Sequence, residues 1–148
     1  MARFRSGDVV ATIPLERIEP DFARAELRLE GYRAPARSFE LRFFADEPQA
    51  NARTPTRGNP RYLGSQYIYG AGAYGAGATE PSRGAVDPFR LDDVDRTPLR
   101  LNITDGLRRY LAQTTPHEAP VTAVSVDRHG DEVEDPGLDF EGVSLVTT

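Results

Sequence analysis

The sequence predicts a mainly β fold, an antiparallel β-sandwich or jelly roll with one short helix near residues 104–113. Apolar and polar residues alternate with a period of two along several segments, which is typical of half-buried strands. Glycine and proline, 13 and 12 residues of 148, divide the chain into short lengths. The size suits one domain, so we expect residues 1–148 to form a single β-sandwich with long loops at about 46–60 and 70–96.

Four strands are expected in the first half of the chain. The first covers residues 8–15, where Pro14 indicates a sheet edge or a bulge. Residues 22–30 alternate strictly, with alanine and leucine on one face and arginine and glutamate on the other. We expect the charged face to be wet and to form ion pairs across strands. Residues 38–45 and 61–69 show the same alternation and are rich in aromatic residues.

The second half holds three further strands, at residues 97–103, 121–126 and 140–146. Between the last two, residues 127–130 form a turn in which Gly130 is placed for a positive φ.

One segment has helical spacing. Leu107, Tyr110 and Leu111 lie at positions i, i+3 and i+4, which places them on one helix face. Thr104 is a candidate N-cap and Asp105 lies in the first turn.

A tandem pentapeptide, Tyr-Gly-Ala-Gly-Ala, occupies residues 69–73 and 74–78. It contains the string G-x-G-x-x-G at Gly70, Gly72 and Gly75, which dinucleotide-binding turns use. That site requires a helix to open at the third glycine, whereas the residues that follow Gly75 are too rich in glycine and proline for a helix. We therefore expect a loop between two strands, which either links them only or inserts its tyrosines into a partner.

Composition excludes several classes of site. The chain has no cysteine, and its two histidines, His117 and His129, lie in turn-like segments without a second histidine nearby. The acidic segment 87–95 lacks the pattern of a calcium-binding loop, and no serine stands in a Gly-x-Ser-x-Gly elbow. We expect no catalytic residues, no metal ligands and no cofactor, and therefore no enzyme.

Charge and hydropathy limit the partners. The formal net charge of −5 argues against nucleic acid as a partner. No apolar run approaches the roughly 20 residues of a membrane span, and the first residues lack the apolar region of a secretory signal. We expect a cytoplasmic protein that does not cross a membrane.

Five residues are candidates for contact with a protein partner. Tyr69 and Tyr74 open the two repeats, and Tyr67 lies two residues before them. Arg57 and Arg61 lie in or beside the proline-rich loop that precedes the same strand. A wider aromatic platform is possible, although alternation places about half of its members in the core: Phe39, Phe43, Phe44, Tyr62, Tyr67 and Tyr69.

Several strings resemble the C-terminal β-domain of bacterial tyrosinase-like, type-3 copper proteins. The likeness covers roughly residues 20–148 and rests on residues 38–46, 50–55, 62–70, 101–108, 121–127 and 140–146. In that family the copper-binding histidines belong to a separate helical domain, which nothing in this chain resembles. The resemblance implies a non-catalytic domain that shields a dicopper site. Related domains can carry histidine or cysteine where this chain has Ala71, Ala73 and Tyr74, so the resemblance implies shielding or a purely structural role rather than copper delivery.

Three functions are compatible with these patterns. The first is an accessory module that binds a protein partner, for example a type-3 copper enzyme, through its loop tyrosines. The second is a structural protein that assembles with copies of itself by burying those tyrosines in a neighbour. The third is a carbohydrate-binding module that uses an aromatic face.

Overall fold

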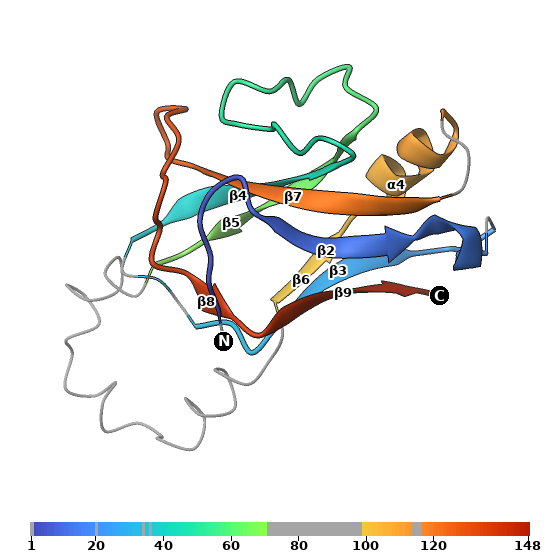
Figure 1. The fold of residues 1–148 in the computed structure, drawn as a ribbon, viewed down its shortest axis with the longest axis horizontal. Helices are drawn as coiled ribbons and strands as arrows, with labels where there is room; N and C mark the ends of the chain where they lie inside the picture. The colour runs from blue at the N-terminus through green and yellow to red at the C-terminus, as the bar shows by residue number, and fades with distance from the viewer. Residues whose placement is uncertain (1, 20, 34, 36, 71–98, 114–116) are drawn as a thin grey trace.

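Two antiparallel sheets pack face to face, which confirms the predicted β-sandwich (Figure 1). The computed structural model of the chain describes residues 2–19, 21–33, 35, 37–70, 99–113 and 117–148. Residues 71–78 of the tandem repeat, Tyr74 among them, and the rest of the expected loop to residue 96 lie outside this set.

The first sheet has four strands in the spatial order β2-β7-β4-β5, and each neighbouring pair is antiparallel. Its members are β2 (Val9–Pro14), β7 (Glu118–Val126), β4 (Phe39–Ala45) and β5 (Tyr62–Ile68). Strand β2 is an edge strand that ends at a proline and carries a register shift near its start. The sequence predicted this edge or bulge, because proline cannot donate to the hydrogen-bond ladder of a central strand.

The second sheet has the order β6-β3-β9. Its members are β6 (Leu99–Asn102), β3 (Ala25–Glu30) and β9 (Gly142–Thr147). A short pair, β1 (Ala2–Arg3) with β8 (Asp139–Phe140), lies beside the sandwich. The strands of the two larger sheets match the predicted segments to within a few residues, whereas β1 was not predicted.

The main core lies between the two sheets, because alternate residues of each strand point toward the other sheet. Its largest fully buried side chains include those of Phe39, Phe43, Ile13, Leu27, Leu29, Leu41 and Val121. Phe39 and Phe43 were candidates for an aromatic binding platform, and the structure places both in this core.

A second, smaller core lies on the outer face of the four-stranded sheet. Phe44, Val124 and Val126 point outward from β4 and β7, and Ala50 of the loop after β4 buries them. The loop of residues 46–61 therefore packs on the sheet near Ala50 and Ala52, whereas Arg53, Arg57 and Arg61 farther along it are exposed; Figure 1 shows the loop above β4 and β7.

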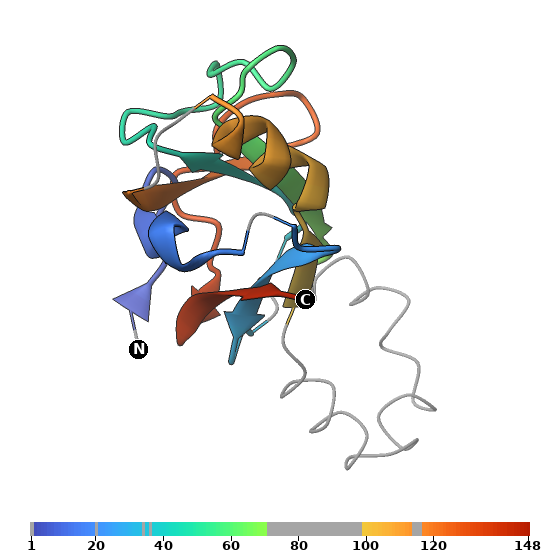
Figure 2. The same cartoon turned by 90° about the vertical axis from the view of Figure 1, so that its right-hand side faces the viewer.

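Helix α4 (Thr104–Leu111) follows β6 and packs against β5 and β3 (Figure 2). Gly106 allows this approach, because a Cβ atom there would lie 2.0 Å from the carbonyl oxygen of Leu63. The helix matches the predicted segment, but the predicted N-cap is wrong. Ile103 occupies the cap position without a side-chain cap bond, and Thr104 is the first helical residue.

The expected ion pairs across strands are also wrong for β3. Glu26 bonds along its own strand, with the Nε–H groups of Arg28 at 2.8 Å and Arg24 at 3.3 Å. Across the strands, Arg28 faces Arg100 of β6 and Ser144 of β9. Register between strands decides these neighbours, and register is not visible in the alternation of one segment.

Within the described ranges, no helix is long and apolar enough to cross a bilayer. The turn at Gly130 has the expected positive φ, 86°.

Candidate functional site

Tyr67 and Tyr69 form an exposed pair at the end of β5, here called the tyrosine pair. Tyr67 faces outward opposite Glu40 of β4, and Tyr69 follows two residues later on the same face of the sheet. The ring centroids are 5.0 Å apart with an edge-to-face angle of 65°. The exposed fractions are 39% for Tyr67 and 62% for Tyr69, so both rings are open to a partner.

The residue after the pair is fixed to the sandwich. Gly70 is buried, and its backbone N–H donates to the Ser38 hydroxyl oxygen at 2.8 Å. A Cβ atom on Gly70 would lie 2.3 Å from the carbonyl carbon of Arg37, so no larger residue fits there without a backbone shift. The first glycine of the G-x-G-x-x-G string is therefore a packing residue, and it sets the position of the tyrosine pair.

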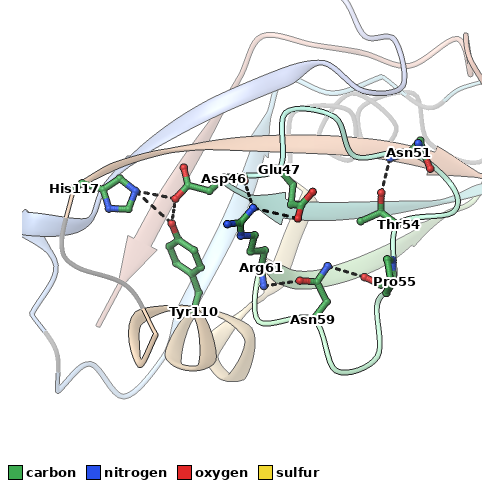
Figure 3. A network of polar contacts seen from close by, with 9 residues as sticks. All are labelled: Asp46, Glu47, Asn51, Thr54, Pro55, Asn59, Arg61, Tyr110 and His117. Atoms are coloured by element: carbon green, nitrogen blue, oxygen red, sulfur yellow. Dashed lines mark hydrogen bonds and ion pairs between the residues drawn. The ribbon is translucent and has the colours of Figure 1, made fainter.

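The two candidate arginines do not join the tyrosine pair. Arg61 directly precedes β5 and Tyr69 directly follows it, so about 25 Å of extended chain separates them. The Arg61 guanidinium donates to the carbonyl oxygen of Asp46 at 3.1 Å and contacts the Glu47 carboxylate at 3.4 Å (Figure 3). It holds its own loop together. Arg57 is exposed in that loop.

A surface pocket of about 590 Å³ lies between this loop and helix α4. Polar groups of Asn59, Arg109 and Gln113 line it together with Tyr62. Arg109 is 3.5 Å from the Tyr62 carbonyl oxygen, which it bonds weakly, and Asn59 bonds the backbone of its own loop. These bonds connect helix α4 to the first residue of β5 and hold the loop to itself.

A polar cluster that the sequence did not reveal joins Asp46, Tyr110 and His117 (Figure 3). The Tyr110 hydroxyl donates to the Asp46 carboxylate, and His117 Nε2 lies 2.8 Å from the same carboxylate oxygen. Asp46 has a positive φ of 56° at the end of β4, which turns its side chain toward the other two. Asp46 is more than 60 residues from Tyr110 and His117 in the sequence, so no local pattern signals this contact.

Three carboxyl groups have pKa values below the ordinary range for their residue type. A hydrogen bond from Arg28 is the main cause of the lowered pKa of Glu26, with Arg24 contributing. The backbone N–H of Asp131 lowers the pKa of Asp127, and the side chain of Arg3 lowers that of Asp135. These shifts arise from hydrogen bonds that stabilise the charged form.

The tyrosine pair offers apolar ring area with two hydroxyl groups. Tyrosine is enriched at protein interfaces because a rigid ring covers a large area while its hydroxyl bonds to polar groups. The two rings of the tyrosine pair are arranged edge to face, so they do not form a flat surface on which a sugar ring could stack. The site is therefore better suited to a protein surface.

Comparison with known proteins finds similarity of fold. No family model matches the sequence, and no curated protein matches it. A solved structure of a recombinantly expressed latent aurone synthase (polyphenol oxidase) aligns with a TM-score of 0.51 and 11% identity, over 99% of this chain and 24% of that chain. The same enzyme co-crystallised with hexatungstotellurate(VI) aligns with a TM-score of 0.48 and 14% identity, over 99% and 26% of the two chains. This chain thus has the fold of about a quarter of a polyphenol oxidase chain.

Proposed function

We propose that this chain is a non-catalytic accessory module that binds a protein partner through the tyrosines at the start of its glycine-alanine repeat. The observation that carries the proposal is the exposed tyrosine pair beside a buried Gly70. A binding residue gains affinity when its backbone is already ordered, because less conformational entropy is lost on binding. Tyr69 combines this fixed attachment with an exposed ring.

The fold supports a type-3 copper enzyme as the partner. The described sandwich resembles part of a chain named as a latent polyphenol oxidase. In this proposal the ring of Tyr69 or Tyr74 enters the concave copper site of the partner, where a phenol imitates a monophenol substrate. Tyr67 packs against Tyr69 and restricts its position. Arg57 and Arg61 contact the partner at the other end of β5.

The test uses a mature bacterial tyrosinase, assayed on a monophenol with and without this chain. We expect the wild-type chain to inhibit, and the double variant Tyr69→Ala/Tyr74→Ala to lose inhibition. The variant Tyr69→Phe/Tyr74→Phe keeps both rings and separates ring packing from hydroxyl contacts. Val9→Ala, at the exposed far edge of the same sheet, is the control. Equal inhibition by the wild type and the double alanine variant would exclude the tyrosines as the contact.

A second function, assembly with copies of the same chain, is favoured by the edge strands. The sequences of β2 and β9, VVATIP and GVSLVT, contain no charged residue, and charged residues are a common protection of strand edges against pairing. Size-exclusion chromatography with light scattering distinguishes the two functions. A large homo-oligomer supports assembly, and a monomer removes it.

A further inference from the structure

The outer face of the three-stranded sheet carries a cluster of arginines around one glutamate. Arg24, Glu26 and Arg28 point the same way because they alternate along β3 and its preceding residue. Arg100 of β6 lies directly opposite Arg28 in the register of the two strands. A shallow pocket of about 280 Å³ lies over them, lined in the described part of the chain by Arg24, Glu26, Arg28, Arg100, Val146 and Thr148.

Glu26 organises two of the three arginines. Its side chain is only 8% exposed, and its two carboxylate oxygens accept from Arg28 Nε at 2.8 Å and Arg24 Nε at 3.3 Å. Each arginine uses its Nε–H group for this contact, so its two Nη groups remain as donors. The glutamate therefore holds both guanidinium groups in place without using their outer donors.

The position of Arg100 is electrostatically unfavourable. It is exposed, and across the described residues it forms neither a hydrogen bond nor an ion pair. Like charges directly opposite on neighbouring strands destabilise a sheet, and Arg28 is the residue opposite. Glu30, on the same face of β3, instead accepts from the Ser144 hydroxyl at 3.5 Å. A bound anion between Arg28 and Arg100 would remove the repulsion.

Charge and donor number define the ligand. The charged side chains that line the pocket, three arginines and one glutamate, have charges that sum to +2. A phosphate group carries about −1.5 to −2 at pH 7 and has at least three acceptor oxygens. Arginine forks bind such oxygens in pairs. A carboxylate carries one charge and two oxygens, so it can pair with the N–H donors of only one guanidinium group.

We propose that this pocket binds a dianionic oxyanion of the phosphate class, either free phosphate or the phosphate group of a monoester. Arg28 and Arg100 hold the anion from opposite strands, Arg24 contributes from the side, and Glu26 positions Arg24 and Arg28. The site lies on the other sheet from the tyrosine pair, so its failure would leave the partner-binding proposal unchanged.

The test is a titration of the whole chain with inorganic phosphate at constant ionic strength, followed by amide chemical shifts in NMR spectra. We expect saturable shifts centred on residues 24–28, 99–102 and 144–148. The variant Arg100→Gln should bind about tenfold more weakly, since a charge-assisted contact is worth roughly one factor of ten or more. Arg53→Gln removes the same charge from an exposed loop on the other sheet and should bind like the wild type.

Competition separates the ligand classes. Sulfate should compete with phosphate, and acetate at equal ionic strength should not. Glucose 6-phosphate that binds as tightly as phosphate identifies a monoester site, whereas binding of inorganic phosphate alone identifies a site for the free ion. The proposal fails if shifts do not saturate, if they centre elsewhere, if Arg100→Gln and Arg53→Gln weaken binding equally, or if acetate competes as well as sulfate.

Discussion

Thr122 is fully buried in β7, and its hydroxyl group has no hydrogen-bond partner in the described structure. A buried hydroxyl without a partner loses its bonds to water and gains nothing in return. We predict that Thr122→Val raises the free energy of unfolding by about 1 kcal/mol, measured by urea denaturation. Thr122→Ser keeps the hydroxyl and removes a methyl group, so it should lower the same quantity. A less stable valine variant would show that the hydroxyl has a partner.

Helix propensity and steric fit have opposite effects on an alanine substitution at Gly106. Alanine is favoured over glycine inside a helix by about 1 kcal/mol, but a Cβ atom at this position would lie 2.0 Å from the Leu63 carbonyl oxygen. The steric effect decides, because the helix cannot withdraw without losing its packing on β5. We predict that Gly106→Ala lowers the free energy of unfolding by about 1–3 kcal/mol, measured by chemical denaturation.

Gly142 is the matched control for this prediction. A Cβ atom there meets nothing within 4 Å, and its φ is not positive. Gly142→Ala should therefore be neutral or stabilise by a few tenths of a kcal/mol, because it reduces the freedom of the unfolded chain. If both alanine variants behaved alike, the close contact of α4 with β5 would be wrong.

At the scale of the elements, Asp46 joins helix α4 to the start of β7. The Tyr110 hydroxyl, from the helix, donates to the carboxylate that also contacts His117. Hydrogen bonds to charged groups contribute about 1.5–3 kcal/mol each. We predict that Tyr110→Phe lowers stability within that range and speeds amide hydrogen exchange in α4 more than in β7.

Tyr67→Phe is the control for this link. It removes a hydroxyl from an exposed ring on β5, so neither global stability nor exchange in α4 should change. Equal exchange in α4 of wild type and Tyr110→Phe would show that the helix is held by its apolar face alone.

The secondary-structure elements and their contacts differ in how well the sequence predicts them. Strict alternation placed β3 and β4 to within a few residues, because period two follows from strand geometry alone. The contacts of Asp46 with Tyr110 and His117, and the packing of loop 46–61 on the outer sheet face, could not be predicted, because they depend on which strands become neighbours. For the same reason, the sequence could not show that Arg28 lies opposite Arg100. The sequence identified the tyrosines as candidates, but it could not show that Gly70, which positions them, is buried.

At the scale of the whole molecule, the two proposed sites occupy different sheets. The tyrosine pair belongs to β5 of the four-stranded sheet, and the arginine pocket belongs to β3 and β6 of the other. The main core between the sheets separates them. Substitutions at one site should therefore leave the other intact, which makes the two proposals independently testable.

The free energy of unfolding of the whole chain should fall as the pH is lowered. Glu26, Asp127 and Asp135 have lowered pKa values in the folded state, so the unfolded chain binds protons at a higher pH than the folded chain does. Their contribution is complete above the ordinary carboxyl pKa values and is lost as pH falls through the lowered folded values. We predict that the free energy of unfolding falls below about pH 4.5, where ordinary glutamate titrates.

Denaturation at a series of pH values measures this fall, and two variants identify its cause. Glu26→Gln removes one titrating group and should flatten the slope below pH 4.5. Arg28→Gln removes the hydrogen bond that contributes most to the lowered pKa of Glu26, so it should flatten the slope in the same direction while leaving the carboxyl group in place. If Arg28→Gln kept the wild-type slope, the ion pair within β3 would not control the titration of Glu26, and the positioning role given to that glutamate in the arginine pocket would also be lost.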